Sequence, residues 1–65
     1  MSLQSELNTI TSTMSELSGR ITALVEGEGD RLAVELYSEL VTAERTVGAL
    51  LRRLNRVAGL AKERQ

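Results

Sequence analysis

The spacing of the apolar residues constrains this 65-residue chain more than any other feature. In the first half, apolar side chains recur at alternating intervals of four and three residues: Leu3, Leu7, Ile10, Met14, Leu17, Ile21 and Leu24. This is a heptad repeat in which Leu7, Met14 and Ile21 occupy position a and the other four occupy position d. The pattern predicts an α-helix over about residues 3–26, with a narrow apolar stripe and Ser2 as its N-cap.

A second heptad repeat fills the rest of the chain and has a broader apolar arc. Its a and d residues are Ala33, Leu36, Leu40, Ala43, Val47, Leu50, Leu54, Val57 and Ala61. Further apolar residues flank these positions, namely Tyr37, Leu51 and Ala58 on one side and Leu32 and Leu60 on the other. The repeat predicts a helix over about residues 30–63. Its broad arc predicts contact with more than one neighbouring helix.

The two repeats are out of register, and the break falls in the stretch EGEGD of residues 26–30. Gly27 and Gly29 are typical of the end of a helix, and Asp30 is a suitable N-cap for the next one. We therefore predict a turn at 27–29. One uninterrupted helix is an alternative. A phosphate-binding loop is disfavoured because there is no preceding strand and no following Lys, and the nearby acids would repel an anion.

The predicted fold class is all-α, an antiparallel two-helix hairpin with heptad seams that assembles into a homodimeric four-helix bundle in a single domain, 1–65. A chain this small is only marginally stable alone, and the absence of Cys and His excludes disulfides and the common zinc sites. Association is the remaining source of a core, with a larger homo-oligomer or a hetero-assembly as alternatives to the dimer. The predicted interface consists of Leu36, Leu40, Val47, Leu50, Leu51, Leu54 and Val57. Residues Leu7, Ile10, Leu17 and Ile21 pack over them.

Three details of this assembly follow from the pattern. The second helix is expected to pair with its symmetry mate at the centre, with the first helix outside. In the lone hairpin the seams cover each other, which leaves the arc of Tyr37, Leu51 and Leu60 exposed. The second helix is the longer one, so residues from about 54 onward project beyond the first helix, where they pair across the dimer or dock another protein. Replacing Leu50 with Asp is expected to unfold the chain, because it buries an unpaired charge.

Charge is distributed unevenly along the chain. Residues 1–44 carry eight acids and two bases, whereas residues 45–65 carry six bases and one acid. Candidate phosphate-binding residues are Arg45, Arg52, Arg53 and Arg56, which would bind nucleic acid as a stripe on the second helix. The structural alternative is that these cations offset the helix dipole or pair with glutamates across an interface. Ends of opposite sign also permit head-to-tail contact between assemblies.

The composition argues against catalysis. Without His or Cys the usual bases and nucleophiles are missing, and we expect no catalytic residue, no cofactor and no metal site. No apolar run is long enough to span a membrane, and the N-terminus lacks a secretory signal, so a cytoplasmic location is the expectation. The expected function is that of a self-associating interaction module: a scaffold, adaptor or small regulator that binds another protein. The alternative is a nucleic-acid-binding dimer.

Overall fold

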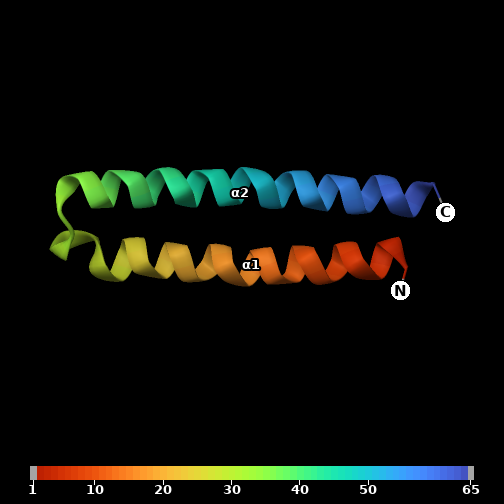
Figure 1. Ribbon diagram of the computed structural model, residues 1–65, viewed down its shortest axis with the longest axis horizontal. Helices are drawn as coiled ribbons and strands as arrows, with labels where there is room; N and C mark the ends of the chain where they lie inside the picture. Colours follow the sequence, from red (N-terminus) through yellow and green to blue (C-terminus); the bar gives the residue numbers. More distant parts are fainter. Residues whose placement is uncertain (1, 65) are drawn as a thin grey trace.

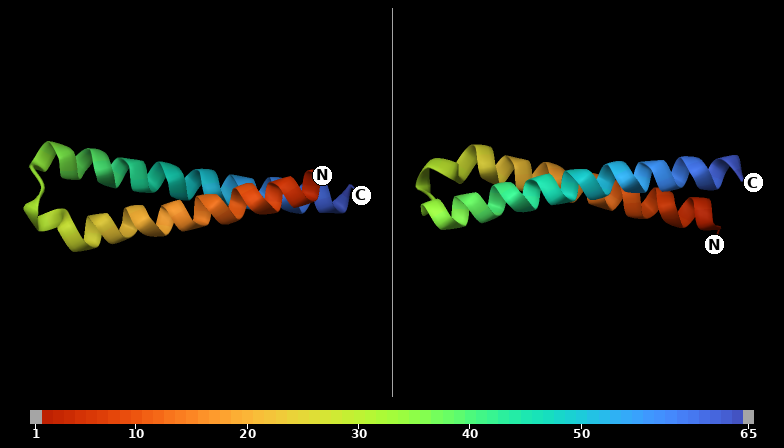
Figure 2. Two further views of the ribbon diagram at one scale, coloured as in Figure 1. Left: turned by 60° about the horizontal axis from the view of Figure 1, so that its bottom comes forward. Right: turned by 90° about the horizontal axis from the view of Figure 1, so that it is seen from above.

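The chain folds into two long helices packed side by side in opposite directions. A computed structural model describes residues 2–64, with helix α1 at Leu3–Glu28, a 3₁₀ turn η1 at Gly29–Arg31 and helix α2 at Val34–Glu63 (Figure 1). The hairpin measures 48 × 15 × 13 Å, and the helices cross at a shallow angle when seen from above (Figure 2). The predicted all-α antiparallel hairpin is therefore confirmed.

Helix α1 begins at the residue expected from the sequence. The Ser2 side chain accepts a hydrogen bond of 3.0 Å from the backbone N–H of Ser5. This bond satisfies one of the N–H groups that have no partner in the first turn of a helix. Ser2 is thus the N-cap of α1, as predicted.

The turn between the helices differs from the prediction. Helix α1 continues through Gly27, and α2 begins at Val34 rather than at residue 30. Asp30 lies inside η1 and does not cap α2, since the residue before α2 is Ala33, without a side-chain cap. The physical reason is that Gly29 keeps a helical φ of −52°. The chain reverses instead through the extended backbone of Leu32 and Ala33, with ψ of 146° and 148°.

The predicted overhang of α2 is wrong. The C-terminal end of α2 reaches only slightly beyond the start of α1 (Figure 1). Leu54, Ala58 and Ala61 are half-buried. The late start of α2 explains the difference, because it leaves 30 residues in α2 against 26 in α1. At the open end of the hairpin, the start of α1 and the end of α2 are therefore almost level.

The helices face each other through positions a and e of the heptads, where e is the residue after d. On α1 the less exposed residues include Leu7, Met14 and Ile21 at a, and Gln4, Thr11, Ser18 and Val25 at e, together with Thr22 at b. On α2 they include Leu40, Val47, Leu54 and Ala61 at a, and Glu44, Leu51 and Ala58 at e. The expectation that the a and d seams cover each other completely is wrong for the d residues.

The contact between the two helices buries few side chains completely. Within residues 2–64, Leu7 is the one side chain that is buried, with 8% of its surface exposed. Several inward positions of α1 are polar, and Gln4 Oε1 and Thr11 Oγ1 are buried without a hydrogen-bond partner. Each such atom costs about 1–3 kcal/mol. The single hairpin therefore has a thin and partly polar interior.

Candidate self-association surface

The d positions of both helices form two exposed apolar stripes. On α1 the stripe contains Leu3, Ile10, Leu17 and Leu24, whose side chains are 39% to 60% exposed. On α2 it contains Leu36, Ala43, Leu50 and Val57, and its three large residues are 41% to 55% exposed. In both helices the residues recur every seven positions, so each stripe runs nearly the whole length of its helix.

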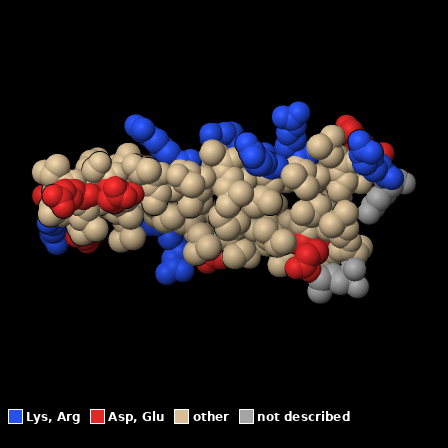
Figure 3. All heavy atoms as spheres, turned by 45° about the horizontal axis from the view of Figure 1, so that its top comes forward, with Lys and Arg blue, Asp and Glu red and all other residues tan. Residues whose placement is uncertain are grey.

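Both stripes lie on the same broad face of the hairpin. Two antiparallel helices that meet through equivalent positions are related by an approximate two-fold axis perpendicular to the plane of the hairpin. Rotation about this axis exchanges the helices without turning the hairpin over, so equivalent heptad positions share one face. We call the eight d residues together the apolar face. Figure 3 shows an uncharged area over the central part of the molecule, with acidic side chains at its left, hinge end and basic side chains mainly along its upper side.

The predicted interface residues fall into two groups. Leu36, Leu50 and Val57 are exposed on the apolar face. The remaining four, Leu40, Val47, Leu51 and Leu54, are half-buried on the side of α2 that faces α1. Leu51 was expected to stay exposed and Leu50 to be covered, and the structure reverses both expectations. The reason is that α1 covers position e of α2 rather than position d.

The sequence-based prediction also gave α1 too small a part in the exposed surface. Its d residues, including Leu3 and Leu24, are as exposed as those of α2. Both helices contribute four residues to the apolar face, and the prediction that α1 lies outside a centre made by α2 stays a prediction about the assembly. The exact seven-residue recurrence of Leu3, Ile10, Leu17 and Leu24 was the available signal.

Charged residues of both signs border the apolar face at position g, the residue before a. Glu6 and Arg20 lie at this position on α1, and Glu39 and Arg53 lie there on α2. All four are exposed. In the described part of the hairpin, the one salt bridge joins Arg31 and Glu28 at 3.8 Å, so these border charges have no ionic partner among residues 2–64.

The other candidate phosphate-binding residues lie away from the apolar face. Arg45, Arg52 and Arg56 are exposed at positions f and c, on the side of α2 turned away from α1. In Figure 3, Lys and Arg side chains lie mainly along the upper side of the molecule. Arg53 belongs instead to the border of the apolar face. The structure thus places three of the four arginines on one outer surface.

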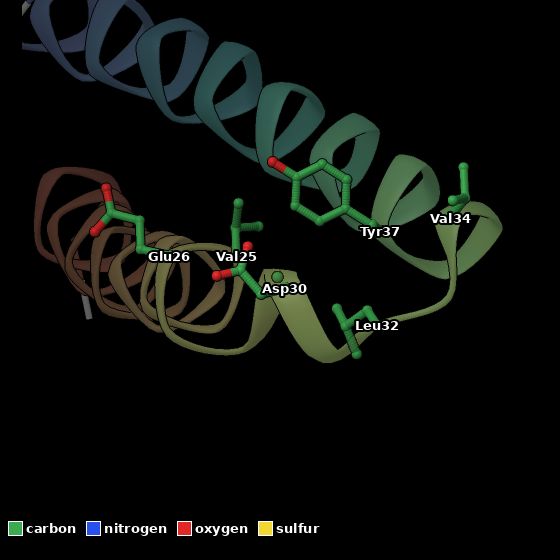
Figure 4. Close-up of a pocket in the computed structure, with 7 residues that line it drawn as sticks. Val25, Glu26, Asp30, Leu32, Val34 and Tyr37 are labelled. Atoms are coloured by element: carbon green, nitrogen blue, oxygen red, sulfur yellow. The ribbon is translucent and has the colours of Figure 1, made fainter.

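A shallow hollow lies at the hinge. It has a volume of about 470 Å³ and is lined by Val25, Glu26, Gly29, Asp30, Leu32, Val34 and Tyr37 (Figure 4). The Tyr37 ring extends from α2 towards the end of α1 and lies close over Gly29. The hollow is open, and Val34 at its rim is 83% exposed. The Tyr37 ring packs closely on Gly29, and this contact is a structural feature of the hinge.

Residues 2–64 form neither a cluster of metal ligands nor a membrane-spanning segment. No group of three acidic side chains comes together in a way that could hold a metal ion. Neither helix, over the same residues, contains a stretch long and apolar enough to cross a membrane. The two candidate functional surfaces are the apolar face and the outer side of α2 that carries Arg45, Arg52 and Arg56.

Comparison with known proteins gives no relative: no family model matches the chain, and no curated protein or solved structure is significantly similar to it.

Proposed function

We propose that this chain is a self-associating interaction module, in which two hairpins pack their apolar faces together as a four-helix bundle. The observation that carries the proposal is the apolar face itself. Seven large apolar side chains are at least 39% exposed on one side of a molecule that buries only Leu7 among its described residues. Continuous exposed apolar surface of this kind marks a site of association.

The heptad geometry supports a bundle. In each helix, position a is turned towards the neighbouring helix of the same chain, and position d is turned about 50° further round the helix axis. When a second hairpin covers the d residues, the centre of the four helices lies between these two directions. Positions a and d then both face a common core, which is the arrangement of four-helix bundles.

The size of the apolar face fits a stable dimer. The broad side of the hairpin that carries the apolar face measures 48 by 15 Å, which is a projected area of about 700 Å². One partner in a standard protein interface contributes roughly 800 Å². The thin, partly polar contact inside the hairpin supports the same conclusion, because a lone hairpin of this size lacks the apolar burial that offsets the entropy of folding.

The biological role that follows is one of interaction rather than chemistry. The bundle would act as a scaffold, adaptor or small regulator, with its outer surfaces free to bind another protein. These outer surfaces carry exposed charges of both signs, including Glu35 and Arg52. Such surfaces favour polar, salt-sensitive recognition of a partner.

Sedimentation equilibrium over a wide range of protein concentrations tests the proposal. We expect a mass of twice the 7.1 kDa of one chain, with helix content that falls on dilution as the dimer dissociates. A folded, well-ordered monomer at high dilution would overturn the proposal. A trimer or tetramer would show that association occurs but that the closed pair of hairpins is wrong.

A second candidate function is nucleic-acid binding by the outer side of α2. The exposed positions of Arg45, Arg52 and Arg56, without ionic partners among the described residues, favour it. The acidic pI of about 5.3 and the presence of a single aromatic residue argue against it. A gel-shift assay at low salt compares the wild type with the double variant Arg52→Glu, Arg56→Glu. Loss of binding in the variant supports this function, and equal weak retention of both proteins excludes it.

A further inference from the structure

We propose that the two hairpins of the dimer lie antiparallel, with their hinges at opposite ends of the bundle. This inference rests on the proposed self-association and concerns the second copy that covers the apolar face. Two closed arrangements bring the faces together. In one, the two-fold axis runs along the bundle and both hinges share an end. In the other, the axis is perpendicular to the bundle and α2 packs on α2 of the second copy.

The polarity of charge along the hairpin favours the antiparallel arrangement. The half nearer the hinge, residues 17–45, carries six acids and three bases, a net charge of −3. The other half, residues 1–16 and 46–65, carries five bases and three acids, a net charge of +2. Antiparallel packing places each acidic half beside a basic half, whereas the other arrangement places like charges together. At an ionic strength of 0.1 M such forces act over about 10 Å, which is the spacing of helices in a bundle.

The sizes of the d residues on α2 favour the same arrangement. Leu36, Ala43, Leu50 and Val57 are evenly spaced, so antiparallel packing places the small Ala43 opposite Leu50 of the second copy. Small residues facing large ones fill a core evenly. With both hinges at one end, the Ala43 residues of the two copies would share one layer with two Leu17 residues. That layer would be underfilled relative to its neighbours, which costs stability in proportion to the void.

The charged border is compatible with this packing. Antiparallel pairing of like helices brings Glu39 of one copy beside Arg53 of the other, and Glu6 beside Arg20, since each pair is two heptads apart. The two-fold axis would pass α2 near Thr46, midway between Glu39 and Arg53. It would pass α1 near Thr13, midway between Glu6 and Arg20. The other arrangement also forms pairs of opposite sign, so the border supports association through this face without selecting the orientation.

Distance measurement between the two copies tests the orientation. The chain contains no cysteine, so Val34→Cys gives one thiol, at a site that is 83% exposed and lies off the apolar face. Twelve residues separate Val34 from Thr46, about 18 Å of helix, and antiparallel packing therefore predicts spin labels about 45 Å apart. With both hinges at one end the labels would be about 25 Å apart, twice the 13 Å thickness of the hairpin.

Cross-linking provides a second, independent readout. Thr46 is exposed at position g and would lie beside Thr46 of the second copy at the two-fold axis. We expect Thr46→Cys alone to form a disulfide-linked dimer. In the other arrangement Thr46 lies beside Thr13, so cross-links would need a mixture of the Thr46→Cys and Thr13→Cys variants.

The measurements distinguish failure of the proposed antiparallel orientation from failure of the proposed self-association. A dimeric mass with the short label distance, or with cross-links only in the mixture, overturns the antiparallel orientation and leaves self-association standing. A monomeric mass for the labelled protein overturns both. A dimeric mass with the long distance and the Thr46→Cys homodimer supports both.

Discussion

Gly29 lies so close to the ring of Tyr37 that a Cβ atom on the glycine would be 2.8 Å from Tyr37 Cε1. The contact joins the end of α1 to the first turns of α2. Tyr37 occupies position e, so this contact helps to set the rotation of α2 that turns e towards α1 and leaves d exposed. The hinge thus depends on a glycine for space, since its φ of −52° is available to any residue.

This close approach predicts opposite effects at two glycines. Gly29→Ala should lower the free energy of unfolding by about 1–2 kcal/mol, because the methyl group displaces the Tyr37 ring. Gly27→Ala is the matched control: nothing lies within 4 Å of its Cβ position, and it lies inside α1. It should raise the stability by about 1 kcal/mol. Urea unfolding followed by circular dichroism measures both, and equal stabilisation by the two substitutions would contradict the packing described.

The N-cap of α1 gives a second prediction. Ser2→Ala removes the hydrogen bond from the Ser5 N–H and should cost about 1 kcal/mol in unfolding free energy. Ser15→Ala is the control, because Ser15 is exposed within the same helix. It should leave stability unchanged or slightly higher, since Ala is the better helix former. The same urea titration distinguishes them, and a Ser2→Ala protein as stable as the control would remove Ser2 as the cap.

Asp30 should behave differently from Ser2. It lies in the 3₁₀ turn η1 and caps neither α-helix, so Asp30→Ala should change the unfolding free energy by less than about 0.5 kcal/mol. The measurement is again the midpoint of urea unfolding, compared directly with Ser2→Ala. A loss for Asp30→Ala as large as that for Ser2→Ala would show that Asp30 caps α2 in solution.

The apolar face gives a prediction about association. Leu50→Asp should weaken the dimer at least 100-fold, about 3 kcal/mol, because each dimer would bury two unpaired carboxylates. Helix content should fall with it, since folding and association are coupled. Val34→Asp provides the matched control, as Val34 is an apolar residue of α2 that lies off the apolar face and is 83% exposed. Sedimentation of both variants measures the dissociation of the dimer. A Leu50→Asp protein as dimeric as Val34→Asp would rule out the proposed interface.

The alternation of three- and four-residue steps was enough to predict two helices, and Ser2 was enough to place the first one. Heptad spacing could not show which neighbour of position a would be covered inside the hairpin. That choice between d and e depends on the rotation of each helix, and in this hairpin e residues such as Leu51 and Ala58 are half-buried whereas d residues are exposed. The sequence supplies the residues of this contact but not their relative orientation across the turn.

The turn was predicted less well for a related reason. Gly27 and Gly29 indicate a helix end in the sequence, yet α1 continues through Gly27 and neither residue has a positive φ. A glycine in a sequence indicates either freedom of the backbone or a need for space, and only the position of Tyr37 shows that space is the reason at Gly29. The sequence shows that Glu39 and Arg53 are charged residues at position g. Only the fold shows that position g lies beside an exposed apolar face.

The sparse burial in the hairpin has a consequence for the kinetics of folding. Leu7 is the one buried side chain among residues 2–64, so the hairpin gains little by closing on itself. Its folding transition state should therefore contain parts of two chains. Refolding would then be a second-order reaction, and each halving of the protein concentration would double the time needed to regain half of the helix.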